Sequence, residues 1–254
     1  ISDSATIGNA QGGDGKGKSG GSGIYSYGDL TISGGKIQKA TGGASTDGNG
    51  GSGIFSGSNL TISSGTIETA QGGDSNASGG MGIRSGGTLT ISDNATIGTA
   101  KGGDGTADDG TGGTGIYSAG RLFISGGEIQ QATGGASTNG SGGSGIYSST
   151  LTISGNATIG NAQGGDGNAS GGSGILGKTM EILAGTIQKA IGGNASNGTG
   201  GSGIRSNGNG TLTIKGGKIE QATGGDSEKY GGSGIYSSSK LTISDSATIG
   251  NAQG

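Results

Sequence analysis

The sequence predicts an all-β fold: a parallel β-helix solenoid with three short strands per coil and about eight coils of 29–33 residues. Three observations predict it. Short apolar segments recur in the same order along the whole chain. Each segment alternates apolar and polar residues with the period of a strand. Glycine accounts for 70 of the 254 residues, which excludes a helical solenoid.

The overall composition taken alone would suggest disorder. Only 26% of the residues are hydrophobic and 12% are charged, and the chain has no Pro, Cys, His or Trp. Chains with so little apolar surface usually cannot offset the conformational entropy lost on folding. Here, however, the apolar residues are almost all Ile, Leu or Ala at regular intervals, which indicates ordered repeats stabilised by stacking of coil on coil.

The first segment is a Gly-Ile pair that follows a run of small residues, as in GGSGIYS at 20–26. We expect a strand whose isoleucine points inward. The isoleucines of the eight copies are Ile24, Ile54, Ile83, Ile116, Ile146, Ile175, Ile204 and Ile235.

The second segment is LTIS or a variant of it, in which the outer residues are apolar and the middle residue is polar. This alternation is typical of a strand with one buried face. The copies begin at Leu30, Leu60, Leu89, Leu122, Leu151, Met180, Leu212 and Leu241.

The third segment has an isoleucine followed three residues later by alanine, as in TIETA at 66–70. The turn before it places this isoleucine seven or eight residues after the leucine of the second segment, so we expect one corner to absorb the extra residue. The predicted core of one coil is Ile24, Leu30, Ile32, Ile37 and Ala40.

A glycine-rich spacer joins the third segment to the next coil, and the distance from its alanine to the next isoleucine is 13 to 16 residues. We expect an arm that protrudes from one edge of the solenoid or packs along it. Dense glycine would also let neighbouring arms pack closely in an extended, polyproline-II-like form.

The pattern GGSGIYS followed by LTISGG and a further Ile resembles the repeats of right-handed parallel β-helix proteins of bacterial cell surfaces. These include large adhesins, autotransporter-like passengers and extracellular carbohydrate-binding β-helices. The resemblance covers the whole chain and implies secretion or surface display, so the expected location is extracellular or at the cell surface. It supplies no catalytic residue, because one coil architecture serves many functions.

The absence of His and Cys removes the usual general base, the Ser-His and Cys-His nucleophiles, and zinc or copper sites. We therefore predict no enzyme and no cofactor, with calcium as the one possible ion. Its candidate ligands are Asp104, Asp108 and Asp109 in the longest spacer, although a solvated loop tip is the favoured interpretation.

A second acidic column follows the Gly-Gly pair of the spacer. Stacked carboxylates there could bind calcium, but turn-forming side chains that accept hydrogen bonds from neighbouring amides are the favoured interpretation. The column consists of Asp14, Asp74, Asp104, Asp166, Asn194 and Asp226.

The residue after each Gly-Ile pair should face outward, because the isoleucine faces inward. The resulting stripe, which we call the aromatic stripe, could contact a glycan or a protein partner. Alternatively, its stacked side chains simply stabilise the sheet. The aromatic stripe comprises Tyr25, Phe55, Arg84, Tyr117, Tyr147, Leu176, Arg205 and Tyr236.

An outward threonine column could suggest ice binding, but Phe123 and Glu181 interrupt it and threonine is a common strand residue. The column consists of Thr31, Thr61, Thr90, Thr152, Thr213 and Thr242. A net charge of −3 without a basic stripe argues against nucleic acid as a partner. No apolar run is long enough to span a membrane.

The first twelve residues, 1–12, are identical to the last twelve, 243–254. We therefore expect residues 1–254 to be a single repeat array, either a window of a longer array or a unit that stacks end to end. The expected function is that of an extracellular structural or adhesive protein, a stalk or filament segment. The alternative is a polysaccharide-binding module that uses the aromatic stripe.

Overall fold

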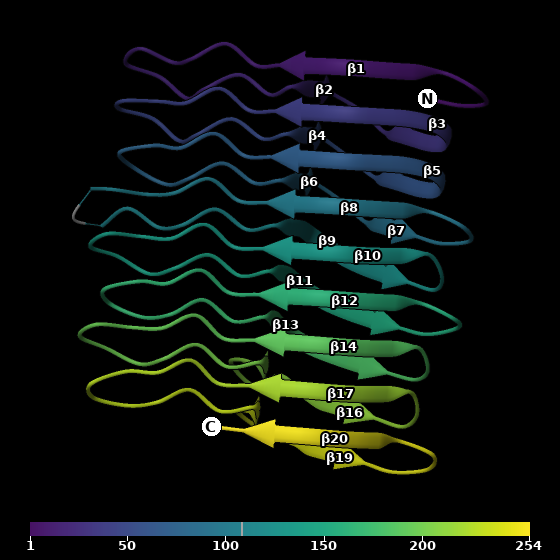
Figure 1. Ribbon diagram of the computed structural model, residues 1–254, viewed down its shortest axis with the longest axis vertical. Helices are drawn as coiled ribbons and strands as arrows, with labels where there is room; N and C mark the ends of the chain where they lie inside the picture. Colours follow the sequence, from purple (N-terminus) through teal and green to yellow (C-terminus); the bar gives the residue numbers. More distant parts are fainter. Residues whose placement is uncertain (108) are drawn as a thin grey trace.

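The computed structural model describes residues 1–107 and 109–254, which form an all-β parallel solenoid of about eight coils (Figure 1). The predicted fold is confirmed. Every strand pairs in parallel with its counterparts in the adjacent coils, on both sides in the interior and on one side at the two ends, and the twenty strands form one continuous sheet. In Figure 1 the nearer strands run to the left and the chain returns to the right behind them while descending, so the coil is right-handed.

Three ladders of strands run the length of the solenoid, one for each predicted segment. The strands of the first ladder alone are β2 (Ile24–Ser26), β4 (Ile54–Ser56), β6 (Ile83–Ser85), β15 (Ile204–Ser206) and β18 (Ile235–Ser237). Strands that pass through the first and second ladders are β9 (Ile116–Ile124), β11 (Ile146–Ile153) and β13 (Ile175–Ile182).

The remaining strands belong to the second and third ladders. The second ladder alone contains β7 (Leu89–Ile91), β16 (Leu212–Ile214) and β19 (Leu241–Ile243). Strands that pass through both are β3 (Leu30–Thr41) and β5 (Leu60–Gln71). The third ladder alone contains β1 (Thr6–Gln11), β8 (Thr96–Lys101), β10 (Glu128–Thr133), β12 (Thr158–Gln163), β14 (Thr186–Ile191), β17 (Lys218–Thr223) and β20 (Thr248–Gln253).

The core consists of the predicted columns of like residues. Register pairs Ile24 with Ile54, and Ala40 with Ala70. In the interior coils these side chains are inaccessible to solvent, as Ile54 and Ala70 are. Burying one Ile or Leu side chain contributes about 1.5–3 kcal/mol, so the columns provide the main apolar stabilisation of a chain that is otherwise polar.

The corner between the second and third ladders absorbs the length variation as expected. Shorter turns place a glycine such as Gly35 in the left-handed region, with φ of 69°. Longer turns place Asp93 there, with φ of 51°. The ladders stay in register across both types, since Ile97 of a longer-turn coil pairs with Ile67 and Ile129 of shorter-turn coils.

The glycine-rich spacers form flat arms that extend from one edge and stack on one another (Figure 1). Each arm has an outgoing leg after the third ladder, a tip, and a returning leg that leads into the first ladder. Parallel bridges connect successive arms, for example Ser45 with Ser75. The arms thus protrude from the solenoid and also pack along each other.

Candidate functional site

The two legs of each arm are joined by a zigzag of backbone hydrogen bonds that runs through the stacked arms. Within one arm the N–H of Gly143 donates to the carbonyl of Gly135 at 2.8 Å. The carbonyl of Gly143 then accepts from the N–H of Gly165 in the next arm, also at 2.8 Å. We call this array the glycine zipper. Its members, in order, are Gly13, Gly21, Gly43, Gly51, Gly73, Gly80, Gly103, Gly113, Gly135, Gly143, Gly165, Gly172, Gly193, Gly201, Gly225 and Gly232.

From the second arm onward the zipper requires glycine because successive arms approach too closely for a side chain. A Cβ atom on Gly143 would lie 1.9 Å from the carbonyl oxygen of Gly113, and one on Gly51 would lie 1.9 Å from that of Gly21. Neither glycine has a positive φ. The missing Cβ, and not an unusual backbone angle, is therefore the reason for glycine at these positions.

The acidic column after the Gly-Gly pair links the arms from coil to coil. Oδ1 of Asp74 accepts a hydrogen bond from the N–H of Asp104, and Oδ1 of Asp104 accepts one from the N–H of Ala136, both at 2.8 Å. Asn194 makes the same contact to the N–H of Asp226 at 2.8 Å. These side chains thus accept hydrogen bonds from neighbouring backbone amides, as the interpretation of them as turn-forming residues predicted.

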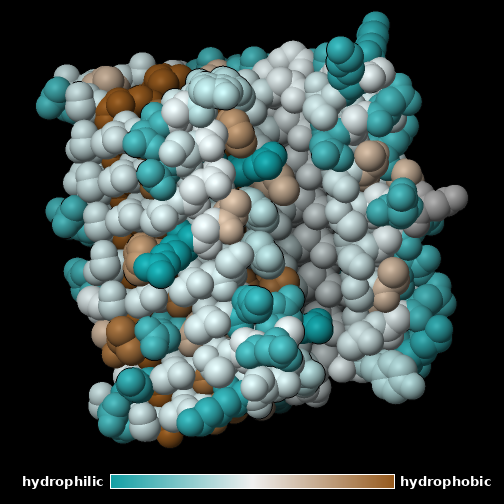
Figure 2. Space-filling view, turned by 180° about the vertical axis from the view of Figure 1, so that it is seen from behind, coloured by the Kyte–Doolittle hydropathy of each residue, from teal (hydrophilic) through white to brown (hydrophobic). Residues whose placement is uncertain are grey.

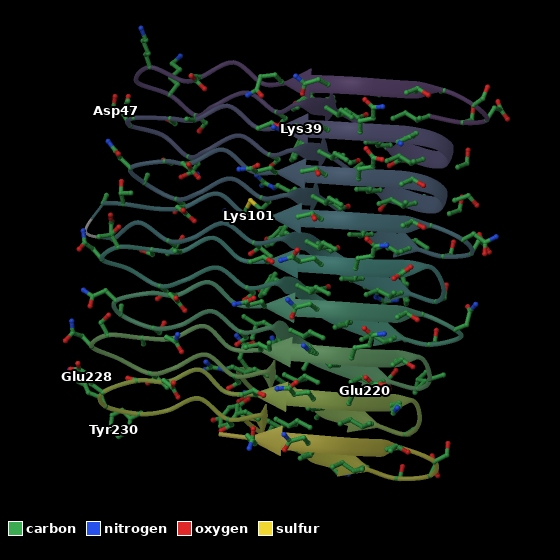
Figure 3. The ribbon with its side chains drawn as sticks, viewed as in Figure 1. Lys39, Asp47, Lys101, Glu220, Glu228 and Tyr230 are labelled. Atoms are coloured by element: carbon green, nitrogen blue, oxygen red, sulfur yellow. The ribbon has the colours of Figure 1, made fainter. Side chains whose placement is uncertain are left out.

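The proposed calcium ligands are only partly described. Asp108 lies outside the described residues, Asp109 is exposed at the arm tip, and the Asp104 carboxylate accepts the amide of Ala136. Among residues 1–107 and 109–254, no three acidic side chains are grouped closely enough to hold a metal ion. Figure 3 shows other charged side chains dispersed, with Asp47 and Glu228 at arm tips.

Replacing Asp104 by alanine should lower the free energy of unfolding by about 1 kcal/mol, because the Ala136 amide loses its acceptor. Replacing it by asparagine should restore most of this loss, since Asn194 already serves in the same role. Asp226→Ala is the matched control, because in the described part of the chain no hydrogen bond to its carboxylate is found. Urea unfolding measures all three, and equal effects of Asp104→Ala and Asp226→Ala would contradict the assignment.

The aromatic stripe faces outward as predicted, and its members stack along the axis of the solenoid. The rings of Tyr25 and Phe55 lie 5.1 Å apart at 22°, and those of Tyr117 and Tyr147 lie 5.3 Å apart at 12°. Between these pairs the guanidinium of Arg84 lies 5.1 Å from the Phe55 ring centre and 6.0 Å from that of Tyr117. Ring faces within the stack are therefore covered, and mainly ring edges and hydroxyl groups are presented outward.

The contact between Phe55 and Arg84 should be measurable as a coupling energy. In a double-mutant cycle with alanine at both positions, we expect a stabilising coupling of about 0.5–1 kcal/mol. The pair Phe55 and Arg205 serves as the control, because the two residues are five coils apart and should not couple. A coupling of zero for Phe55 with Arg84 would show that the stack does not stabilise the sheet.

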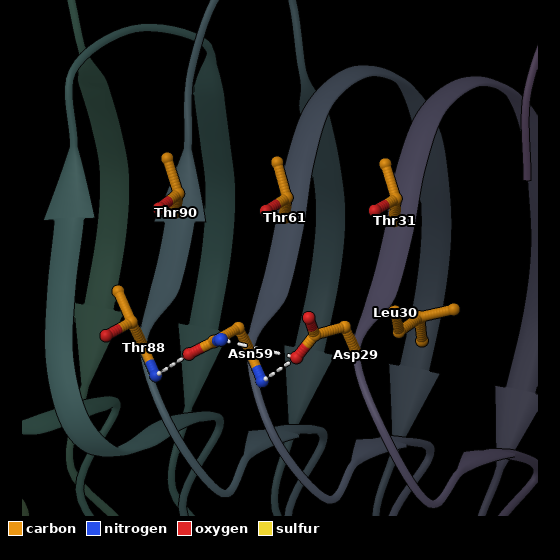
Figure 4. Close-up of a pocket in the computed structure, with 7 residues that line it drawn as sticks. All are labelled: Asp29, Leu30, Thr31, Asn59, Thr61, Thr88 and Thr90. Carbon is orange, nitrogen blue, oxygen red and sulfur yellow. Dashed lines mark hydrogen bonds between the residues drawn. The ribbon is translucent and has the colours of Figure 1, made fainter.

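The threonine column of the second ladder borders a shallow hollow of about 410 Å³ (Figure 4). Side chains beside it again link successive coils. Oδ1 of Asp29 accepts a hydrogen bond from the N–H of Asn59 at 2.9 Å, and Oδ1 of Asn59 accepts one from the N–H of Thr88 at 3.0 Å. Thr90 pairs with Phe123 in the next coil, so the threonine array is interrupted there as the sequence indicated.

The hydrogen bond from the Asn59 amide, with support from Ser58, holds the pKa of the Asp29 carboxyl below its ordinary value. We expect its NMR titration midpoint to lie below that of the same carboxyl in the urea-unfolded chain, near 3.9. Because the folded-state pKa is the lower one, Asp29 stabilises the fold above pH 3.9 and loses this contribution as the pH falls through the folded value. Identical midpoints in both states would contradict the hydrogen bond.

A groove runs along the back of the molecule where the returning legs meet the first ladder. Figure 2 shows it as a pale hollow between the solenoid body and the arm tips. We call it the back groove. One stretch of it is a depression of about 220 Å³. Its lining residues are Thr199, Gly200, Ser202, Arg205, Gly231, Gly232, Ser233 and Tyr236.

The sequence interpretation included one wall of this groove and missed its floor. Arg205 and Tyr236 belong to the aromatic stripe, whereas Ser202 was not singled out. A signal was present, because Ser or Thr stands just before seven of the eight Gly-Ile pairs, with Met81 as the exception, but serine is equally common in loops. Its column consists of Ser22, Ser52, Met81, Thr114, Ser144, Ser173, Ser202 and Ser233.

Comparison with protein-family models, with curated proteins and with solved structures gave no match to this chain. The assignment of a parallel β-solenoid therefore depends on the strand pairing itself. Within the described residues, no helix is long and apolar enough to cross a lipid bilayer.

Proposed function

We propose that this chain is an extracellular structural or adhesive repeat protein, a stalk or filament segment of the kind that its repeats resemble in bacterial surface proteins. The main observation in support of the proposal is that non-covalent contacts between neighbouring coils continue along the whole solenoid. Three strand ladders, the core columns and the glycine zipper all connect each coil to the next. Such an array is stabilised between neighbouring repeats and gains rigidity with length.

The outer surface supports the same proposal. The outward residues of the third ladder vary from coil to coil among Thr, Lys, Gln, Asn, Glu and Gly, with Ile191 in one coil, while the inward Ile and Ala stay constant. Constant core columns and variable outer columns are expected when the coil serves as a scaffold. Reach and surface contact, with partners such as further coils of the same kind and cell-surface glycans, would then be its function.

A tandem chain tests this proposal directly. Residues 1–254 followed by a second copy of residues 13–254 would continue the repeat pattern without interruption, because 1–12 and 243–254 are identical. Small-angle scattering should show one straight particle longer by eight coils, about 40 Å. The melting temperature should also rise. A bent or two-body particle, or an unchanged melting temperature, would contradict a stalk function.

A polysaccharide-binding module is the second candidate, and one observation favours it. The exposed aromatic stripe borders the back groove, which is long enough to follow a linear polymer across several coils. The covered ring faces argue against sugar rings stacked flat on the stripe. Any sugar contact would instead involve ring edges, hydroxyl groups and the guanidinium groups.

A further inference from the structure

The floor of the back groove carries a column of serine hydroxyl groups that have no hydrogen-bond partner among the described residues. Ser202 is only 5% exposed and lines the depression. Its hydroxyl forms no hydrogen bond with any residue in 1–107 or 109–254. The equivalent Ser52, Ser144 and Ser173 are also at most 7% exposed and equally unpartnered within those residues. The hydroxyl oxygens themselves reach the groove surface, because the buried side-chain atoms without a partner in the described residues belong to Thr41, Asn161 and Arg205. This column therefore presents free hydroxyl groups to the groove, where a ligand or ordered solvent can bind them.

Backbone groups of the floor are free as well. Gly201 uses both its N–H and its carbonyl in the glycine zipper, to Gly193 and from Gly225. In contrast, the carbonyl of Gly200 accepts no hydrogen bond and the N–H of Ser202 donates none within the described chain. Each such coil therefore offers one acceptor, one donor and one hydroxyl group, and these repeat with the coil spacing of about 4.8 Å.

The wall of the groove carries two arginines of the aromatic stripe, Arg84 and Arg205. Nε of Arg205 is buried without a hydrogen-bond partner, and its guanidinium lies 5.5 Å from the ring centre of Tyr236. Arg84 is exposed, its faces contact Phe55 and Tyr117, and its N–H groups donate to no residue in the described part of the chain. None of the residues that line the depression is acidic. An anionic group in the groove would thus meet arginine donors without a competing carboxylate.

We propose that the back groove binds a linear acidic polysaccharide that lies along the solenoid axis. This inference rests on the second candidate function and names its site and ligand class. Sugar hydroxyl groups are both donors and acceptors, so they can satisfy the Gly200 carbonyl and the Ser202 amide and hydroxyl together. Carboxylate or sulfate groups of the polymer would pair with Arg84 and Arg205.

A polypeptide fits these groups less well. In an extended strand, residues on the same face recur about every 6.6–6.8 Å. They would therefore not stay in register with coils that are spaced about 4.8 Å apart. A proline-rich segment has a more suitable pitch, but proline lacks the N–H donor that the free Gly200 carbonyl needs. The paired requirement for donors and acceptors in every coil favours a polyhydroxyl chain.

The test uses the full chain and two forms of one polymer. In affinity electrophoresis, polygalacturonate should retard the wild-type chain, and its fully methyl-esterified, uncharged form should retard it less. Arg84→Gln with Arg205→Gln should weaken retardation about tenfold. The matched control is Lys39→Gln with Lys189→Gln on the third ladder, which removes the same number of positive charges. It should change the retardation by less than about twofold.

A second pair of substitutions separates the groove from general charge attraction. Ser173→Ala with Ser202→Ala removes two floor hydroxyls without changing charge, and it should weaken binding about threefold while the far-ultraviolet circular dichroism stays unchanged. No retardation of the wild-type chain, equal losses in the arginine and lysine variants, or an unaffected serine variant would overturn the proposal. Capture of a proline-rich decapeptide in place of the polymer would also overturn it.

The stalk proposal is assessed separately by scattering on the same samples. A rigid particle that fails to bind the polymer removes only this inference. A particle without the expected length removes the stalk proposal and leaves the binding result intact.

Discussion

Replacing Gly143 by alanine should lower the free energy of unfolding by about 3 kcal/mol or more. The new methyl group would lie 1.9 Å from the carbonyl oxygen of Gly113, which is itself a zipper acceptor. Backbone atoms cannot move aside as the end of a flexible side chain can. The legs must therefore separate, and hydrogen bonds to the neighbouring arms are lost with the local contact. Urea unfolding followed by circular dichroism measures the change.

Gly231→Ala is the matched control, because the nearest atom to a Cβ at this position is 4.0 Å away. Alanine there should change stability by less than about 0.5 kcal/mol, or increase it slightly through a less flexible unfolded chain. Its neighbour Gly232 would place a Cβ 1.8 Å from the Gly201 carbonyl oxygen. If Gly231→Ala and Gly232→Ala had the same effect, the steric account of the zipper would be wrong.

Removing one core isoleucine in the middle of the solenoid should have a comparable effect. Ile153→Ala is expected to lower the free energy of unfolding by about 2–5 kcal/mol, and Ile153→Val by about 0.5–1.5 kcal/mol. Ile153 is fully buried and pairs in register with Ile124 and Ile182 above and below. The cavity therefore interrupts a continuous column, and the flanking coils can close it only by shifting three ladders together.

Leu183→Ala provides the comparison for this core substitution. Leu183 directly follows the second ladder and is 40% exposed. The substitution Leu183→Ala should lower the free energy of unfolding by less than about 1 kcal/mol. A similar loss for Leu183→Ala and Ile153→Ala would show that the columns do not hold the coils together.

The sequence was sufficient to predict the ladders and their core. Apolar residues such as Ile54, Leu60 and Ile67 recur with period two inside segments and with a nearly constant spacing between coils, and this combination has few solutions other than stacked parallel strands. The aspartate contacts were also foreseeable, because an aspartate after two glycines commonly accepts a neighbouring amide. The structure confirms both.

The arms and the groove depend on information that the sequence pattern does not carry. Glycine has no side chain whose polarity could reveal which leg it faces, so the pairing of Gly143 with Gly135 and Gly165 was not predictable. Outward orientation of Phe55 and Arg84 was predicted correctly, but their stacking depends on side-chain rotation about the Cα–Cβ bond. That rotation decides whether ring faces or ring edges meet a ligand.

Hydrogen exchange of the arm glycines tests the central claim most directly, namely that the arms are part of the hydrogen-bonded fold. Amides of Gly113, Gly135, Gly143 and Gly165 should exchange as slowly as those of the core strands β11 and β12. The exposed tip residue Asp47 should exchange rapidly in the same experiment. Fast exchange of the zipper glycines together with the tips would mean that the arms are ordinary loops, and the account of the zipper would fail.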